Sequence, residues 1–293
     1  MSRSGFVALA GRPNVGKSTF VNAVVGEKIA IVSDRPQTTR RAIRGVLVHG
    51  DCQLVLVDLP GVQRPRDVLT SRMARRVQQE MNDADATLLI VNGEQGVGPG
   101  DRFIAHQLAA AETPVAIAVN KIDRLARAPL LAVLEDAAAL QLDGEIFPVS
   151  ARSGTGVDQL ISHLASLMPD GPFLFEPGAR SDQPTEQLIA ELIREAVIRR
   201  TFQEVPHAAE VVVEEVERRE NGLERIRALI WVESESQKAI LVGAGGRMIK
   251  AIGIAARKEL ERALEARVHL DLSVRVRRDW RADDALLDRL GIT

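Results

Sequence analysis

Residues Gly11–Ser18 read GRPNVGKS and decide the fold of the first half of the chain. They follow a short apolar run, Phe6–Ala10, and precede Thr19–Val25, which is typical of the start of a helix. The pattern G-x-x-x-x-G-K-[ST] between a strand and a helix predicts a phosphate-binding loop, because glycines let successive main-chain N–H groups point at one anion. The helix amino terminus adds its positive end. We expect Lys17 to reach the β- and γ-phosphates of a nucleotide and Ser18 to bind Mg²⁺.

A second candidate site ends the strand-like run Gln53–Val57, where the chain continues as DLPG over residues 58–61. A carboxylate at Asp58 can hold Mg²⁺ through water. Gly61 has no Cβ, so its N–H can approach a γ-phosphate closely. A D-x-x-G pattern alone is more often an ordinary turn, but its distance from the phosphate loop favours the binding site.

The motif NKID at residues 120–123 predicts base recognition. The Asp123 carboxylate can accept hydrogen bonds from the N1–H and N2–H₂ groups of guanine, which adenine does not offer. The aliphatic part of Lys121 can cover the ring face, and main-chain N–H groups of Ser150–Arg152 can meet the guanine carbonyl. We therefore predict GTP and GDP as ligands. The alternative of a P-loop kinase or ATPase is disfavoured by Asn120 and Asp123.

The order of phosphate loop, switch threonines, D-x-P-G, N-K-x-D and S-A-x resembles the translation-factor-related GTPases. The resemblance implies that one threonine within Ser33–Arg40 completes the Mg²⁺ shell when a γ-phosphate is present. We predict Thr39, with Thr38 as the alternative. The alternative for both threonines is that they have no role in binding and are β-branched residues leading into the next strand, Ala42–Val48.

Val62 follows Gly61, where Ras-like proteins place the glutamine that orients the attacking water. Valine neither donates nor accepts hydrogen bonds, so we expect slow intrinsic hydrolysis. In related GTPases with a hydrophobic residue at this position, an asparagine in the phosphate loop can coordinate K⁺. That resemblance makes K⁺ a candidate ion at Asn14. The predicted catalytic residues are Lys17, Thr39, Gly61 and Asn14, and the predicted metal ligands are Ser18, Thr39 and Asp58. The predicted nucleotide-binding residues are Gly11, Asn14, Val15, Gly16, Lys17, Ser18, Thr19, Asp58, Gly61, Asn120, Lys121, Asp123, Ser150, Ala151 and Arg152.

Composition bounds the remaining possibilities. The chain has 293 residues, 45% of them hydrophobic, and a formal net charge of −2; this length fits one large or two ordinary domains. Cys52 is the single cysteine, which excludes an intrachain disulfide framework and favours a reducing compartment. We expect neither a signal peptide in the short polar segment Met1–Gly5 nor a membrane-spanning helix, which needs an apolar run of about 20 residues.

The rhythm of the chain changes near residue 170. Strand-like runs alternate with helical patterns before it and predict a doubly wound α/β P-loop GTPase domain over residues 1–170. A stretch dense in proline and glycine predicts a linker over residues 171–184. Residues 185–293 predict the order helix–strand–strand–helix–helix–strand, with a hairpin at Asn221-Gly222. This α+β order resembles a KH domain of the bacterial type, type II.

The pattern G-x-x-G over residues 243–246 lies between two apolar helical stretches of this second domain. In KH domains such a loop clamps a nucleic-acid backbone. Residues 237–281 contain eleven Lys and Arg against five Asp and Glu, an excess that suits a phosphate partner, although a solvated helix face is the alternative. The predicted RNA-binding residues are Gly243, Ala244, Gly245, Gly246, Arg247 and Lys250. In this loop Ala244 replaces a lysine or arginine that is usual in the family resembled.

Together the two domains resemble the Era family of GTPases over nearly the whole chain, including the segments Gln237–Ile240, Ile252–Leu260 and Val268–Leu270. The resemblance implies a GTP-hydrolysing switch that binds small-subunit, 16S-type ribosomal RNA near its 3′ end and assists small ribosomal subunit assembly. It also implies a cytoplasmic protein with some peripheral contact with the inner membrane, and we expect a monomer. The alternative is a second domain that binds a protein partner, which an interaction insensitive to salt would favour.

Overall fold

The computed structural model describes residues 2–33, 35, 38–111 and 113–292, and its contacts divide the chain into two compact units. The first unit comprises residues 1–30, 39–66 and 70–182, and the second comprises residues 31–38, 67–69 and 183–293. The predicted fold class, an α/β domain followed by an α+β domain, is confirmed. The boundaries at residues 170 and 185 stay a prediction.

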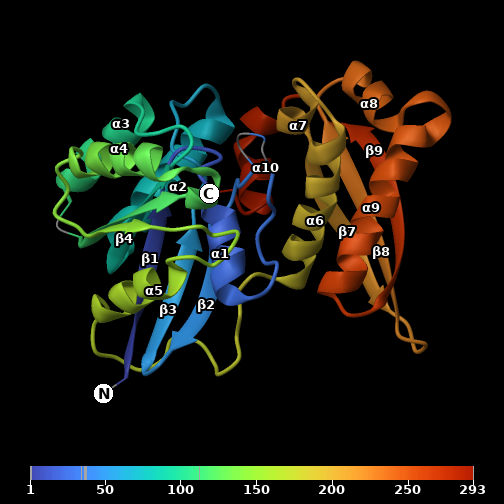
Figure 1. The fold of residues 1–293 in the computed structure, drawn as a ribbon. Helices are drawn as coiled ribbons and strands as arrows, with labels where there is room; N and C mark the ends of the chain where they lie inside the picture. The colour runs from blue at the N-terminus through green and yellow to red at the C-terminus, as the bar shows by residue number, and fades with distance from the viewer. Residues whose placement is uncertain (1, 34, 36–37, 112, 293) are drawn as a thin grey trace. The chain divides into compact units, whose positions relative to one another are not determined.

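A six-stranded sheet forms the centre of the first unit, in the order β2-β3-β1-β4-β5-β6 (Figure 1). Strands β2 and β3 pair antiparallel, and every other neighbouring pair is parallel. Because parallel strands end at one edge of a sheet, β1, β3 and β5 bring the phosphate loop, Asp58 and Asn120 to the same edge. The strands are β1 (Arg3–Ala10), β2 (Ile43–His49), β3 (Cys52–Asp58), β4 (Ala86–Asn92), β5 (Val115–Asn120) and β6 (Ile146–Pro148).

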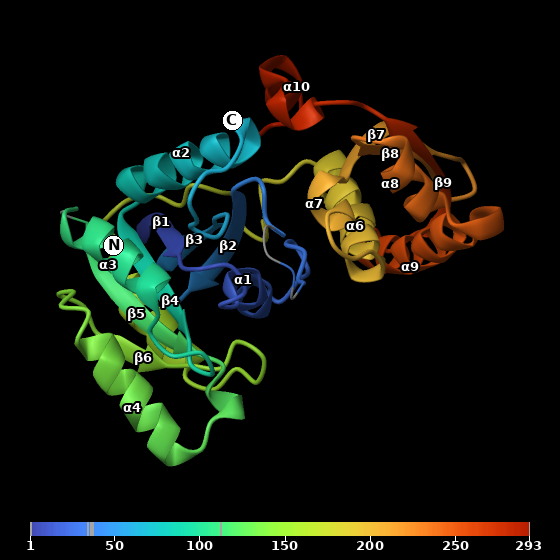
Figure 2. The ribbon, with the colours of Figure 1, turned by 90° about the horizontal axis from the view of Figure 1, so that it is seen from above.

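Helices cover both faces of this sheet, as Figure 2 shows. Strand β1 illustrates the period of two: Val7 and Leu9 join the core under α1 and α5, whereas Ala8 and Ala10 join the core under α2, α3 and α4. Both faces of β1, β3, β4 and β5 are therefore apolar, as in a doubly wound sheet. The helices are α1 (Lys17–Val25), α2 (Val68–Asp83), α3 (Pro99–Ala109), α4 (Arg127–Ala138) and α5 (Val157–Ser166), and a 3₁₀ turn, η1 (Ile122–Arg124), follows β5.

The chain after α5 runs back along the first unit before it leaves. A polar side chain in strand β3, Gln53, is fully buried there; its amide donates to the Phe175 carbonyl at 2.9 Å and accepts the N–H groups of Leu174 and Phe175. An isolated bridge then pairs Gly45 with Ser181. The proline- and glycine-rich segment is thus fastened to the sheet over most of its length, and the contacts change unit between residues 182 and 183.

The second unit is built on a three-stranded sheet in the order β7-β8-β9, with β7 and β8 antiparallel and β8 and β9 parallel. The hairpin predicted at Asn221-Gly222 joins β7 to β8, and Gly222 has the positive φ of 74° that such a turn requires. Helices α6 and α9 bury one face of the sheet in a single core. The elements are α6 (Thr185–Arg200), α7 (Val205–Ala208), β7 (Glu210–Arg218), β8 (Leu223–Val232), α8 (Glu235–Val242), η2 (Ala244–Gly246), α9 (Arg247–Ala263), β9 (Arg267–Val276), η3 (Trp280–Ala282) and α10 (Asp284–Arg289).

One helical stretch bears on the expectation that the chain has no membrane-spanning helix. Residues Glu235–Ala263 form a helical stretch that is long and apolar enough to cross a membrane by length and composition. That criterion is weak by itself, and the glycines of the loop break the stretch into α8 and α9, with φ of 70° at Gly243 and 76° at Gly246. Leu241, Ile252 and other apolar residues of the stretch lie in the core of the second unit.

Trp280, in η3 near the carboxyl terminus, is a buried residue of the second unit. Its side chain is fully buried, and its indole N–H donates to the Ala208 carbonyl at 2.9 Å. This bond fixes η3 against α7 and satisfies a carbonyl that would otherwise be buried without a donor.

We predict that Trp280→Phe destabilises the second unit by about 1–3 kcal/mol, because phenylalanine fills most of the space but leaves the Ala208 carbonyl unpaired. Trp231→Phe is the control, since Trp231 is only half-buried. Both tryptophans of the chain lie in the second unit, so tryptophan fluorescence during urea unfolding reports this unit in either variant. Equal midpoints for the two variants would contradict the role assigned to Trp280.

Candidate nucleotide-binding site and nucleic-acid groove

The phosphate loop depends on glycine at two positions. Gly11 and Gly16 have φ of 153° and 105°, values that other residues rarely adopt. A Cβ on Gly11 would lie 2.6 Å from the Ile90 carbonyl oxygen, and a Cβ on Gly16 would lie 2.3 Å from Nδ2 of Asn120. The loop is therefore shaped by close packing against β4 and against the predicted guanine motif.

Lys17 begins α1 and points back into the loop. Its ammonium donates to the carbonyls of Gly11 and Arg12, both at 3.1 Å. Burial lowers the pKa of Lys17 to about 8, and the nearby Asp58 carboxylate opposes that shift. An anionic phosphate in the loop would favour the charged form further, so the geometry suits phosphate binding.

Three oxygen-bearing side chains converge beside Lys17. The Ser18 hydroxyl donates to Oδ2 of Asp58 at 2.6 Å, and the Thr39 hydroxyl lies 3.2 Å from Oγ of Ser18 and 3.4 Å from the same Asp58 oxygen. Thr38 is directed elsewhere, because its hydroxyl donates to the Arg35 carbonyl at 2.6 Å. One carboxylate and two hydroxyls are the hard oxygen donors that suit Mg²⁺ and leave positions for phosphate oxygens and water. Within the described part of the chain, no group of three or more His, Cys, Asp or Glu residues is gathered for another metal.

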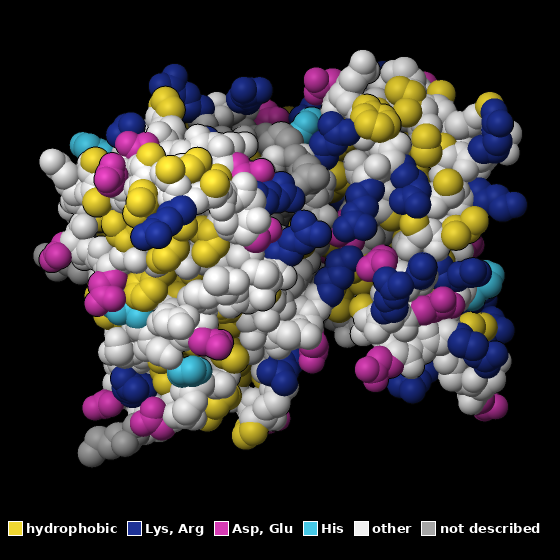
Figure 3. All heavy atoms as spheres, viewed as in Figure 1, with side chains coloured by type: hydrophobic (Ala, Val, Ile, Leu, Met, Phe, Trp, Pro, Cys, Tyr) yellow, Lys and Arg dark blue, Asp and Glu magenta, His cyan; other side chains and the backbone are white. Residues whose placement is uncertain are grey.

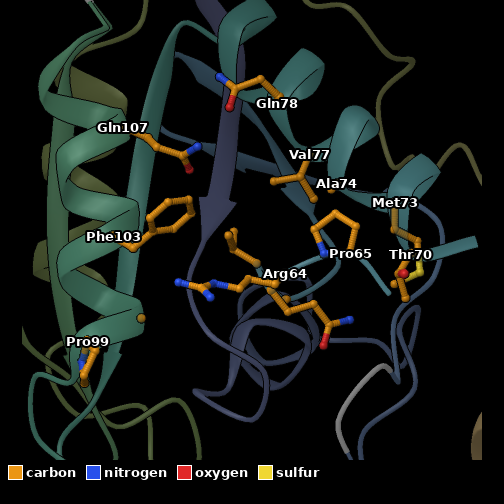
Figure 4. A pocket seen from close by; sticks show the side chains of 14 residues that line it. Arg64, Pro65, Thr70, Met73, Ala74, Val77, Gln78, Pro99, Phe103 and Gln107 are labelled. Carbon is orange, nitrogen blue, oxygen red and sulfur yellow. The ribbon is translucent and has the colours of Figure 1, made fainter. Parts of the chain in front are cut away.

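Gly61 and Val62 lie against the phosphate loop. A Cβ on Gly61 would lie 2.7 Å from the Pro13 nitrogen, and the Val62 N–H donates to the Gly11 carbonyl at 3.2 Å. The Val62 side chain packs against the core under α2 and α3. A mostly apolar cavity of about 400 Å³ opens beside this segment, with Phe103 and Gln107 of α3 on one side and Met73 and Val77 of α2 on the other (Figure 4). The position that holds a glutamine in Ras-like proteins thus offers no polar side-chain atom.

The predicted guanine motif and the phosphate loop are joined by hydrogen bonds. The Asn120 amide donates to the Val15 carbonyl at 2.9 Å and accepts the Ala151 N–H at 3.0 Å. The Lys121 ammonium donates to the Asn14 carbonyl at 2.9 Å. Asn14 and Lys121 both have left-handed backbone conformations, with φ of 64° and 69°. Residues that the sequence separates by more than a hundred positions therefore form one site.

Asp123 is oriented by a neighbour. The Ser150 hydroxyl donates to Oδ1 of Asp123 at 2.7 Å. This bond fixes the orientation of the carboxylate group. The Ser150 N–H itself donates to the Thr155 carbonyl at 2.9 Å, and Arg152 is exposed. The structure thus brings the S-A-R segment to the N-K-x-D motif, as the sequence order predicts for a guanine pocket.

One anchor of the phosphate loop is missing from the sequence prediction. Arg12 pairs through Nε with Oδ2 of Asp101 at 2.8 Å, and its Nη2 donates to the Gly96 carbonyl at 3.1 Å. The Asp101 side chain is fully buried, and it also accepts the Gly98 N–H at the start of α3. An acidic residue in the first turn of α3 is the only sequence signal, and nothing in it identifies Arg12 as the partner.

The G-x-x-G loop of the second unit is open to solvent on one side. Gly245 and Gly246 have φ of 60° and 76°, and a Cβ at either position would meet no atom within 4 Å. Gly243 is closed, since a Cβ there would lie 2.8 Å from Cβ of Met248. Arg247 folds back, and its Nε donates to the Ala244 carbonyl at 3.2 Å. The loop thus presents bare main chain at Gly245 and Gly246.

A groove lies between β9 and α9, the helix that follows this loop. Its volume is about 390 Å³, and its helical wall includes Lys250, Gly253, Ile254 and Arg257 at the spacing of one helix face. Ile254 is 55% exposed and adds an apolar surface to this wall. Figure 3 shows Lys and Arg side chains gathered on the face of this unit that carries α6 and α9. The sequence prediction included Lys250 but not the rest of the groove.

Comparison with known proteins fits this arrangement. Residues 6–121 match the family described as 50S ribosome-binding GTPase, and residues 204–281 match the KH domain family. GTPase Era of Lactobacillus helveticus is 42% identical over 289 residues, which are 99% of this chain and 96% of the relative. The chain belongs to the Era family of GTPases. The resemblance inferred from the motifs is thus confirmed, and the protein is a GTPase, converting GTP and water to GDP and phosphate.

Solved structures of Era proteins have the same fold over the full length. Era in complex with MgGDPNP and nucleotides 1506–1542 of 16S ribosomal RNA gives a TM-score of 0.95 at 32% identity, with both chains covered completely. An Aquifex aeolicus Era variant bound to GDP and AlF₄⁻ gives a TM-score of 0.93 at 32% identity, with 99% of each chain covered. Both units described above are therefore parts of one Era architecture.

We predict that Gly16→Ala weakens binding of both GDP and GTP by about 100-fold, because the new Cβ displaces the Asn120 amide and strains the loop at positive φ. Gly26→Ala is the matched control: Gly26 also has positive φ, but a Cβ there meets no atom within 4 Å. Titration of fluorescently labelled GDP measures both variants. Parent-like affinity in Gly16→Ala would show that the Asn120 contact does not shape the loop.

Proposed function

We propose that this protein is a GTP-dependent switch that binds small-subunit ribosomal RNA near its 3′ end through the second unit and thereby assists assembly of the small ribosomal subunit. The main support is the G-x-x-G loop, because two of its glycines present bare main chain where a phosphate backbone can approach. The Era structure that holds 16S ribosomal RNA supports it by similarity.

In the proposed nucleotide site, the phosphates lie in the loop formed by Gly11 and Asn14–Thr19, with Lys17 neutralising their charge and the Gly61 N–H at the γ-phosphate. Asn120, Lys121, Asp123 and the Ser150–Arg152 segment enclose the guanine. Ser18, Thr39 and Asp58 would hold Mg²⁺, and the bound ion would neutralise charge on the phosphate oxygens. The Era complexes with MgGDPNP and with GDP and AlF₄⁻ support this assignment.

We further propose that intrinsic hydrolysis is slow, because Val62 cannot orient the attacking water. Coordination of K⁺ at Asn14 stays a prediction. The proposed domain limits are residues 1–170 for the GTPase domain and 185–293 for the KH domain. The proposed setting is the cytoplasm, with the protein acting as a monomer, and peripheral contact with the inner membrane stays a prediction.

In the second unit, the proposed RNA site starts at the G-x-x-G loop, where the predicted contacts are Gly243–Gly246 and Arg247. It continues along Lys250 and Arg257, whose charges lie on the helical wall of the groove. Ala244 contributes no charge to the loop, so we assign more of the phosphate attraction to Arg247 and Lys250. Ile254 and the apolar part of the groove would receive the unstacked bases.

The test is RNA affinity across a salt series, with a GTP analogue bound throughout and the 3′ segment of 16S ribosomal RNA as the probe. We predict that Gly246→Asp lowers affinity at least about tenfold, because it adds negative charge and a Cβ where phosphate should approach. Gly222→Asp is the matched control: it adds the same charge at a glycine of positive φ with open space, at the β7–β8 hairpin.

The affinity of the parent should fall with salt, with a logarithmic slope of about −0.7 per phosphate contact on a single strand. GTP-analogue affinity should be the same in both variants and the parent. A flat salt response, or a Gly246→Asp variant that binds RNA as the parent does, would leave the protein-partner alternative as the better account of the second domain.

A further inference from the structure

Helix α6 buries a cluster of charged side chains. Glu191, Arg194 and Glu195 are 1%, 0% and 2% exposed, although they lie in the middle of a helix. Burying charged groups is costly unless they are paired and hydrogen-bonded. Ile31 lies in the same hydrophobic core as α6, and the contacts place residues 31–38 in the same compact unit as this helix. The charged cluster therefore lies where the predicted switch segment packs.

The cluster holds the main chain of that segment at both ends. The Val32 N–H donates to Oε1 of Glu195 at 3.2 Å, and Glu195 also pairs with Arg199 at 2.8 Å. Nη2 of Arg194 donates to the Thr38 carbonyl and pairs with Glu191 at 2.5 Å. Nε and Nη1 of Arg194 have no acceptor among the described residues, so the contact to Thr38 rests on one nitrogen of the guanidinium.

The Thr38 carbonyl belongs to the peptide unit that begins Thr39. Because that unit is planar, fixing its oxygen also fixes the direction in which the Thr39 nitrogen and Cα leave it. Thr39 in turn places its hydroxyl 3.2 Å from Oγ of Ser18 and 3.4 Å from Oδ2 of Asp58. Once that peptide plane is fixed, only two torsions, φ and χ1 of Thr39, set the direction of its hydroxyl.

We propose that Arg194 is a positioning residue for GTP hydrolysis, which from helix α6 holds the Thr38 carbonyl and so keeps the Thr39 hydroxyl directed at the metal-binding oxygens. This inference rests on the proposed function of Thr39 as the switch threonine. Since that threonine acts when a γ-phosphate is present, Arg194 supports the triphosphate state and has no role in binding GDP. By linkage, a change in the packing of α6 alters affinity for GTP and not for GDP.

The experiment compares four variants with the parent, using GDP and the non-hydrolysable analogue GDPNP, each titrated at several Mg²⁺ concentrations. Glu191→Gln/Arg194→Met removes the guanidinium without leaving a buried carboxylate unpaired. Arg194→Lys keeps one charged donor. Arg200→Met is the matched control in the same helix, and Thr39→Ala removes the switch hydroxyl itself.

For the double variant we expect about tenfold weaker binding of GDPNP, the loss of one charged hydrogen bond. We also expect a higher Mg²⁺ concentration for half-saturation with GDPNP and unchanged binding of GDP. Arg194→Lys should recover part of the loss, and Arg200→Met should match the parent. If the double variant does not fold, Arg194→Lys decides, since the inference requires a smaller but selective loss for GDPNP.

Equal effects on GDP and GDPNP, or no effect on either, would overturn the role of Arg194. Thr39→Ala distinguishes failure of the Arg194 role from failure of the Thr39 assignment. If Thr39→Ala loses GDPNP affinity and the Arg194 variants do not, this inference fails and the proposed function stands. If Thr39→Ala binds GDPNP and Mg²⁺ as the parent does, the assignment of the switch threonine is wrong.

Discussion

The amide of Asn120 is the contact on which the rest of the nucleotide site depends. It donates to the Val15 carbonyl in the phosphate loop and accepts the Ala151 N–H beyond β6. A buried amide that satisfies a donor and an acceptor on two loops fixes both, because losing either bond leaves a buried polar group unpaired. The phosphate loop and the guanine pocket are therefore one construction. The same contact requires glycine at position 16, because a Cβ there would occupy the space of the Asn120 amide.

Further contacts in the first unit hold the phosphate loop and the guanine motif in place. Lys121 donates to the Asn14 carbonyl, and Ser150 orients Asp123. On the other side of the loop, Arg12 is paired with the buried Asp101 of α3. The Lys121 bond holds main chain of the loop and the Arg12–Asp101 pair holds one of its side chains, so contacts from outside the loop preorganise it. Such preorganisation lets the binding energy of the phosphates appear as affinity instead of being spent on ordering the loop.

Much of this could be predicted from the sequence where chemistry is local. The strand–loop–helix around GRPNVGKS, the D-x-P-G turn and the N-K-x-D motif could be recognised from residue type and spacing. The order of predicted helices and strands was enough to predict the fold class of both domains. The sequence predicts Thr39 as the switch threonine, with Thr38 as the alternative. In the structure the Thr38 hydroxyl donates to the Arg35 carbonyl, whereas the Thr39 hydroxyl lies beside Asp58. The roles of the site residues in binding and catalysis stay predictions.

What the sequence could not show are pairings between distant residues. Arg12 with Asp101, Gln53 with the segment around Phe175, and Arg194 with Thr38 have no signature in spacing. The groove beside the G-x-x-G loop was missed for a related reason, since it is formed by a helix face and a strand that are brought together only by the fold. The helical stretch broken at Gly243–Gly246 shows the converse, because composition alone matches a membrane span while backbone geometry divides it.

The most direct test of this account measures the affinity of Asn120→Ala for tripolyphosphate in the presence of Mg²⁺, by calorimetry. This ligand has no base, so a residue that only recognises guanine would not affect it. We predict that Asn120→Ala binds tripolyphosphate about tenfold more weakly than the parent, from the loss of the bond that holds the loop, whereas Asp123→Ala binds it as the parent does. Parent-like affinity in Asn120→Ala would contradict the claim that the two halves of the site form one construction.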